Sequence, residues 1–361
     1  MPFRRVVVGV DFTDTSLAAA RWASVQLAPE AEIVLAHIAP EPTPPQFLRG
    51  HLPLVAEIVT ENETALHRGL SGLADLVGRA RASVEMLSGQ PADGLAAIAR
   101  RVGADAICVG KSVKRRGSAR FGATTASRLL MRTELPVVVV PAGARGAPAR
   151  LLAAVSDRAA DDAVLRHAGR LAARWGASLE AIHVVEPAVR ERARELVAAM
   201  TATPATLPPA IVDDSLLHAL AEQWIASQLP HARLPSRAAT SLVRHGDPGQ
   251  EIIAHARLAA ADLIVVGRGA FASADAEMPH ACGAGSTARL VLWAAECPVI
   301  VLGRSPVRLA PTVVAVEADA RARGTPFILG RSSRRGVLVP QRQPRQSRPP
   351  RRPGPGGGDA A

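Results

Sequence analysis

Two segments of the chain place small and hydroxyl residues just ahead of an apolar, helix-like stretch, where an anion could be held. They are GSTARLVLWAAECPVIVL (285–302) and ATTASRLLMRTELPVVVV (123–140). Ser286 or Thr287 is a favourable N-cap for the helix predicted in the later segment, and unpaired N–H groups at such a helix start suit an anion. Pro298 ends that helix, and the apolar run after it is typical of a strand buried on both faces. The alternative is a tight, well-capped turn that holds no ligand.

Other chemistries find little support in the residue spacing. The chain has no GxxxxGK[ST] loop, and the stretch GVDFTDTS lacks the glycine pattern of a dinucleotide-binding turn. The ten histidines are scattered without H-x-x-x-H spacing, and no C-x-x-C pair is present. We therefore predict no catalytic constellation and no metal site.

The elements that must position these residues occur twice along the chain. The matched segments are 4–23 with 149–168, 33–42 with 180–187, 103–112 with 260–269, and 122–140 with 284–302. Copies of this length are whole domains and not short solenoid repeats. We predict an internal duplication with domains at 1–144 and 148–304, followed by a tail at 305–361.

Each copy has the element order of a doubly wound α/β sheet. Strand and helix patterns alternate, with a long helical stretch after the second strand and a loop before the last helix. In the last helix of the second copy, Leu290, Trp293 and Ala294 are predicted to share one face. Ligands of such sheets lie outside the carboxyl ends of the strands. The relevant ends in the first copy are Asp11, the HIAP exit of the second strand, and Gly110.

Residues 3–303 resemble two tandem universal stress protein domains. The motifs that carry the resemblance are VVVGVDFTDTSLAAARWA, LAHI and IHVV, GADAICVG and AADLIVVG, and above all GSTARLVLWAAECPVIVL. The resemblance implies a five-stranded parallel sheet with two helices on each side, dimerisation through the last strand, and either a nucleotide-binding or a non-binding type. The binding type carries a glycine, two residues, a glycine, nine residues, then glycine and serine or threonine, with an aspartate after the first strand.

The first copy keeps part of that pattern. Asp11 and Gly110 match the aspartate and the first glycine, and Thr124 keeps the hydroxyl, whereas Val113 and Ala123 replace two glycines. A Cβ at those two positions could block close approach of the backbone to a phosphate. The loop KSVKRRGSAR carries five basic side chains and no acid, so charge could hold a phosphate instead, or the loop could be only a solvated face.

The second copy departs from the pattern differently. Its glycines are spaced more widely, and Ser156 stands at the aspartate position with Asp157 one residue later. The neighbouring His37 and His183 are expected to pack at strand ends. The nucleotide-binding positions that the resemblance implies are Gly9, Asp11, Thr13, Ile38, Gly110 and Thr124 in the first copy, and Val184, Gly267, Gly269, Gly285, Ser286 and Thr287 in the second.

Two functional hypotheses stay open, with a third beside them. In the first, ATP or a related adenine nucleotide, with Mg²⁺, occupies at least one copy. In the second, the protein is a nucleotide-free scaffold that acts through protein partners. The third is weak ATP hydrolysis or autophosphorylation, with Ser286 or Thr124 as phosphate acceptor. Self-association through the last strand of a domain, or pairing of the two domains within one chain, is expected.

Charge concentrates at the end of the chain. Of the net charge of +11, residues 304–361 contribute +9, from twelve arginines against three acids. From about residue 331 the tail is rich in Pro, Arg and Gly, so we predict disorder and either an acidic partner or a plain solvated extension. Residues 304–330 could add a short strand or pack on a domain.

The cysteines and the apolar runs bear on the compartment. Three cysteines argue for a reducing environment without a disulfide framework. Cys108 and Cys297 are predicted to be core residues, and Cys282 an exposed thiol. The N-terminus lacks the apolar core of a signal peptide, and no apolar run reaches the ~18 residues of a membrane span. A cytoplasmic protein without a membrane span is expected.

Overall fold

The computed structural model describes part of the chain. The described ranges are 3–27, 29–39, 52–78, 81–111, 124–156, 162–201, 214–235, 237–269 and 286–303. All described residues belong to one compact unit, residues 1–308. The expectations for Val113, Ala123, Asp157, Cys282, Gly285 and the tail from residue 304 lie outside the described residues.

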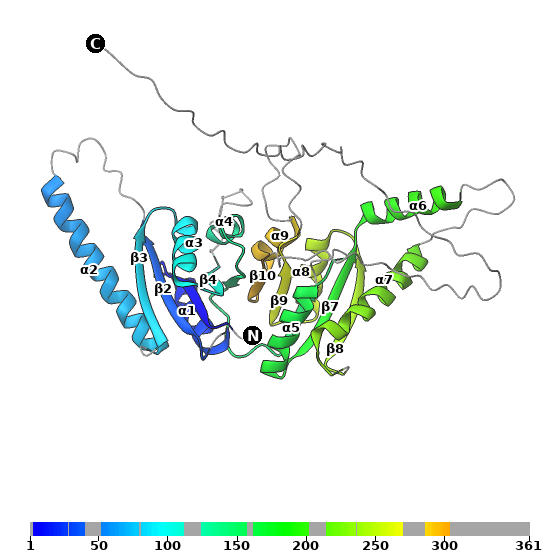
Figure 1. Cartoon of the computed structure of the whole chain (residues 1–361), viewed down its shortest axis with the longest axis horizontal. Helices are drawn as coiled ribbons and strands as arrows, with labels where there is room; N and C mark the ends of the chain where they lie inside the picture. The colour runs from blue at the N-terminus through cyan, green and yellow to red at the C-terminus, as the bar shows by residue number, and fades with distance from the viewer. Residues whose placement is uncertain are drawn as a thin grey trace, which may run out of the picture. The chain divides into compact units, whose positions relative to one another are not determined.

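The first half is a five-stranded parallel sheet with helices on both faces (Figure 1). Its strand order is β3-β2-β1-β4-β5, and each neighbouring pair within it is parallel. Its elements are β1 (Arg5–Gly9), α1 (Asp14–Trp22) with a π-helical turn η1 (Ala23–Leu27), β2 (Glu32–Ala39), α2 (Leu52–Val77), β3 (Ala82–Ser88), α3 (Pro91–Val102), β4 (Ala106–Gly110), α4 (Thr125–Arg132) and β5 (Val137–Val140).

The second half repeats this design with the strand order β10-β9-β6-β7-β8, again parallel throughout. The predicted pair of doubly wound five-stranded sheets is therefore confirmed. Its elements are β6 (Arg150–Ala154), α5 (Asp162–Trp175), β7 (Ser178–Val185), α6 (Pro187–Thr201), α7 (Asp214–Gln228), the 3-10 turn η4 (Leu229–Ala232), β8 (Ala239–His245), α8 (Pro248–Leu258), β9 (Leu263–Gly267), α9 (Ser286–Ala294) and β10 (Val299–Leu302).

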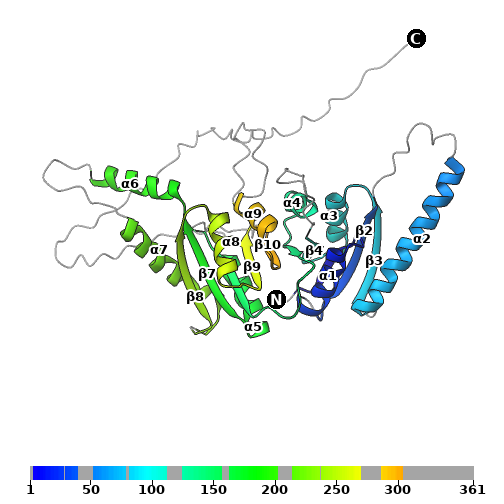
Figure 2. The same ribbon diagram turned by 180° about the vertical axis from the view of Figure 1, so that it is seen from behind.

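Apolar strand runs explain the layers. The central strands are buried on both faces, because runs such as VVVV in β5 and VIVL in β10 offer no polar side to water. One face of the sheet packs against α1, α2, α5 and α7, and the other against α3, α4, α8 and α9. Figure 2 shows α3 with α4, and α8 with α9, beside their strands. Two helices thus cover each face of each half.

The buried face of α9 differs from the one expected. Ala288, Val291 and Leu292 are buried, whereas Trp293 is 40% exposed. Leu290 points instead toward α8, where a Cβ on Gly249 would lie 2.7 Å from its Cδ2. The helix therefore divides its apolar residues between the sheet and a neighbouring helix, which a single-face pattern does not anticipate.

The two halves join through their last strands, which pair antiparallel and make one ten-stranded sheet. Val138 lies opposite Ile300, and Val137 opposite Val301. Val138 and Ile300 are also equivalent in the duplication, 162 positions apart. Equivalent strands that meet in this way are related by an approximate two-fold axis through that pair.

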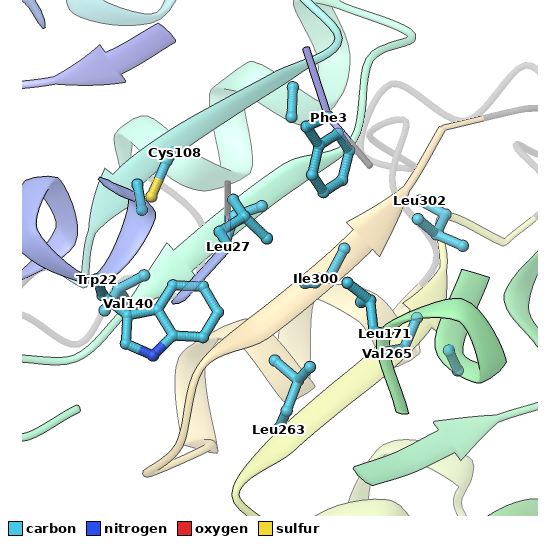
Figure 3. Close-up of a cluster of buried hydrophobic side chains, with 14 of the residues drawn as sticks. Phe3, Trp22, Leu27, Cys108, Val140, Leu171, Leu263, Val265, Ile300 and Leu302 are labelled. Carbon is cyan, nitrogen blue, oxygen red and sulfur yellow. The ribbon is translucent and has the colours of Figure 1, made fainter. Parts of the chain in front are cut away.

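One hydrophobic cluster continues across the join. Figure 3 shows Trp22, Leu27 and Val140 of the first half beside Ile300 and Leu302 of the second. Hydrogen bonds reinforce the contact at the end of α5, where Arg174 Nη1 donates to the Leu27 carbonyl at 2.9 Å and Trp175 Nε1 to that of Gln26 at 3.3 Å. The halves therefore share a core.

Candidate functional site

The second half contains a cavity of about 650 Å³ at the carboxyl ends of its strands. The ends of β6, β7 and β9 form its floor, and the first residues of α8 and α9 form part of its wall. The structure brings five of the predicted positions of this copy to that cavity, namely Val184, Gly267, Gly269, Ser286 and Thr287. Ser156, at the aspartate position, lines it as well.

The turn after β9 is built from glycine. Gly267 ends the strand, and Gly269 has a φ of 78°, in the left-handed region that favours glycine. Across the cavity, Ser286 and Thr287 begin α9, so their N–H groups belong to the helix start. A bent glycine backbone beside a helix N-terminus can accommodate an anion.

Several lining residues were not predicted from the sequence. The wall includes Glu186, which directly precedes α6, and Val189 and Arg192 from the first turns of that helix. Asp247 is the N-cap of α8, where its Oδ1 accepts a hydrogen bond from Gln250 N at 2.9 Å. Helix α6 belongs to the stretch that is longer in the second copy, so no repeat partner could signal it. Asp247 lies in the stretch RHGDPGQ, which resembles SGQPADG of the first copy and by itself indicates no ligand.

Strands β4 and β9 each end in a glycine, and the basic residue that follows each glycine contacts the opposite half. Arg268 lines the cavity, but its side chain is only 1% exposed, with Nη1 3.4 Å from Glu134 Oε2 and Nη2 donating to the Leu135 carbonyl at 3.4 Å. Its counterpart Lys111 reaches from the first half to the second, where its Nζ donates to the carbonyl of Ala295, just after α9. Lys111, counted from the sequence among the cations of a phosphate loop, is thus engaged in the contact between halves.

In the first half, Asp11 is held in a compact turn. Its Oδ1 accepts hydrogen bonds from Thr13 Oγ1 at 2.5 Å and Thr13 N at 3.1 Å, and Phe12 between them has a φ of 60°. Burial raises the pKa of Asp11, but hydrogen bonding to Thr13 and Ser16 outweighs this and holds the pKa below its ordinary value. The carboxylate is therefore ionised at neutral pH, and Thr13 caps α1.

Two glycines of the first half have packing roles. A Cβ on Gly110 would lie 2.5 Å from the carbonyl carbon of Thr15, so only glycine allows β4 to end against α1. A Cβ on Gly9 would lie 2.9 Å from Leu95 Cδ1 on α3. Ile38 is buried at the end of β2, and its Cδ1 lies where a Cβ on Gly94 would come within 2.6 Å. These residue types are explained without a ligand.

Hydroxyl and imidazole groups at the element ends make local hydrogen bonds. Thr124 is the N-cap of α4, with its Oγ1 accepting from Ser127 N at 3.2 Å. His37 Nδ1 lies 2.7 Å from the Val10 carbonyl, and His183 Nδ1 lies 2.9 Å from that of Val155. Because a carbonyl only accepts, Nδ1 carries the proton in both. As expected, both histidines pack at strand ends.

The described ranges lack two further kinds of feature. Within them, no group of three or more His, Cys, Asp or Glu side chains could hold a metal ion. Within the same ranges, none of the helices combines the length and the apolar character needed to cross a bilayer.

Comparisons with known proteins agree with this architecture. The model of the Universal stress protein family matches residues 2–141 and 149–303. A universal stress protein structure from Archaeoglobus fulgidus DSM 4304 is 16% identical, with a TM-score of 0.54, over 83% of this chain and 98% of its own. A structure from Pseudomonas aeruginosa UCBPP-PA14, described as of the same family, is 16% identical, with a TM-score of 0.51, over 83% and 93%.

Shorter similarities also exist. A structure described as a universal stress protein in complex with cAMP is 23% identical over 40% of this chain and 100% of its own, with a TM-score of 0.31. The search of curated proteins found no match. At these identities the solved structures establish the fold and no more.

Proposed function

Because the chain belongs to the universal stress protein family, as a member with two tandem domains, we propose that it binds ATP or a related adenine nucleotide in at least one half and acts by regulation and not by turnover of a metabolite. The observation that carries the proposal is the second-half cavity. It combines several apolar side chains, a glycine turn and a helix N-terminus at the carboxyl ends of parallel strands.

The first half supports the proposal less directly. Its ionised Asp11 at the end of β1 could accept hydrogen bonds from a base or a sugar, and it follows Gly9 and Val10 at the equivalent strand end. Mg²⁺ would enter bound to the phosphates of the nucleotide, because the described residues offer no cluster of His, Cys, Asp or Glu that could hold it. We place the protein in the cytoplasm on its sequence.

The alternative function is a nucleotide-free scaffold, and specific contacts favour it for the first half. Gly110 is required there by α1, and Gly9 by α3, so neither glycine is evidence of a ligand. Thr124 has a complete role as a helix cap. A protein with such a half would present surfaces to a partner instead of a site.

Calorimetric titration of the full chain with ATP tests the proposal. Ser286→Ala and Asp11→Ala remove the hydroxyl and the carboxylate from the two halves, with Ser227→Ala on α7 and Asp93→Ala on α3 as exposed controls. We expect binding that one site variant weakens by about tenfold while its control does not. Absence of heat and of a thermal shift at millimolar ATP, and with other adenine compounds, would leave the scaffold.

A further inference from the structure

The charged side chains at the second-half cavity are Glu186, Arg192, Asp247 and Arg268. Arg268 is engaged elsewhere, because its guanidinium is buried and pairs with Glu134 of the other half. Among the described lining residues this leaves Arg192 facing two carboxylates. A ligand that enters meets more negative than positive side-chain charge.

Both carboxylates sit at the starts of helices. Asp247 caps α8 through Gln250 N. Glu186 directly precedes α6, and its carbonyl accepts from Val189 N at 3.0 Å and Arg190 N at 3.2 Å. Since backbone contacts hold these positions, the two acids belong to the wall of the site.

The positive contributions at the cavity are small. The start of α9 at Ser286 and Thr287 supplies the partial positive charge of a helix N-terminus, about half an elementary charge. The starts of α6 and α8 add partial charges of the same size, which Glu186 and Asp247 offset. With Arg192 included, the cavity is close to neutral and has no surplus to balance the charge of a polyphosphate. Each terminal phosphate brings about 1.5 to 2 negative charges near neutral pH, and a triphosphate brings more.

Apolar side chains form part of the remaining wall. Val184, Val189, Ile252 and Val266 line the cavity beside the backbone of the strand ends. Such a surface suits an aromatic base and the carbon face of a sugar, with a few polar groups to orient them. The cavity therefore has more to offer a nucleoside than a chain of phosphates.

The charges in the sequence before α4 and before α9 also differ between the two halves. Between Gly110 and Thr124 the chain carries five Lys or Arg and no acid. Between Gly267, the counterpart of Gly110, and Ser286 it carries two acids and one basic residue, the buried Arg268. The equivalent connections therefore have opposite charge.

We propose that the second half selects an adenine nucleoside bearing at most one negative charge, such as adenosine or its cyclic monophosphate, over ATP. This inference rests on the proposed function and narrows it, because polyphosphate binding is then left to the first half. Charge, not shape, makes the distinction, so it is open to a direct test.

The test uses the full chain with 8-azidoadenosine and 8-azido-ATP as photolabels, followed by mass spectrometry to assign each labelled peptide to residues 2–141 or 149–303. Unlabelled adenosine, cyclic AMP and ATP compete. In the second half we expect adenosine and cyclic AMP to displace label at concentrations about tenfold lower than ATP.

Charge variants sharpen the result. Glu186→Gln with Asp247→Asn keeps the shape and the α8 cap, since asparagine caps as well as aspartate. It should improve ATP competition in the second half about tenfold and leave adenosine unchanged. Arg192→Gln should weaken cyclic AMP but not adenosine. Thermal unfolding checks that each variant folds.

The outcomes separate this inference from the proposed function. Second-half labelling that ATP displaces better than adenosine, or a double variant that shifts both ligands equally, overturns the inference. Competed labelling confined to the first half overturns it too, while the proposed function stands. If no adenine compound displaces label from either half, the proposed function itself fails.

Discussion

Gly110 lies so close to the backbone of α1 that its lack of a side chain is a packing requirement. The same residue matches a glycine of the family's nucleotide pattern, so residue type alone supports two explanations. Contact geometry distinguishes them, because a Cβ would meet backbone atoms of Thr15 and Ser16 that cannot move aside as a flexible side chain can.

Gly110→Ala should therefore lower the free energy of unfolding by about 1 to 3 kcal/mol, as overpacking does. Gly143→Ala is the matched control, because a Cβ there meets nothing within 4 Å. Urea denaturation of both variants measures the difference. An unchanged stability for Gly110→Ala, together with weaker ATP binding, would contradict the packing explanation.

His167 makes the fold sensitive to acid. It lies on α5 with its ring 5.4 Å from that of Phe3, and burial, followed by repulsion from Arg170, lowers its pKa from 6.5 to about 4. The unfolded chain thus binds the proton more readily. The stability contribution is complete above about pH 6.5 and is lost as the pH falls toward 4, with a limit of about 3 kcal/mol.

His167→Gln should flatten this dependence. Unfolding free energies at several pH values between 7.5 and 4.5 measure the slope for the variant and the wild type. His67→Gln on the exposed side of α2 is the control and should keep the wild-type slope. Equal slopes in wild type and His167→Gln would show that other groups cause the acid sensitivity.

Among the elements, strands were the most predictable and loops the least. Runs such as VVVV and LIVVG are buried on both faces, so the order of strands along the chain followed from pattern and repetition. Helix α6 has no counterpart among the described residues of the other copy, which is why Glu186 and Arg192 were missed. Leu290 of α9 packs toward Gly249 of α8, and the pattern of a single helix does not show which helix lies beside it.

The cross-half contacts of Lys111 and Arg268 were also beyond prediction. A basic residue after a strand that ends in glycine is as consistent with phosphate binding as with a contact between halves. Only the position of the other half shows which groups each side chain contacts. Residues at strand ends and helix starts could thus be located from sequence, while their partners in the other half could not.

Arg268→Met should weaken the attachment of the halves. Methionine keeps much of the buried volume but loses the contacts with Glu134 and Leu135. We expect the free energy of unfolding to fall by about 1 to 2 kcal/mol. The decrease stays this small because Glu134 is 66% exposed, so water can solvate its carboxylate once the arginine is gone.

Arg257→Met removes an exposed pair with Glu296 at 3.1 Å and should change the free energy of unfolding by less than about 0.5 kcal/mol. Chemical denaturation of the two variants gives the comparison. Equal effects would show that Arg268 adds nothing beyond a surface pair.

For the whole molecule, the pairing of β5 with β10 decides the oligomeric state we expect. The backbone groups of β5 and β10 pair with each other within one chain, so neither of these two strands is free to pair with a second copy. Light scattering behind size exclusion should give 37.6 kDa over a wide range of protein concentration. A mass near twice that value would show that another surface self-associates.

The approximate two-fold axis through Val138 and Ile300 has an evolutionary consequence. Two identical chains that meet about such an axis must carry the same mutations on both sides. Once a short connection such as residues 141–149 makes them one chain, each half can accumulate mutations independently. The association of the two halves then no longer depends on the protein concentration. A gene fusion of this kind converts symmetry into an opportunity for specialisation.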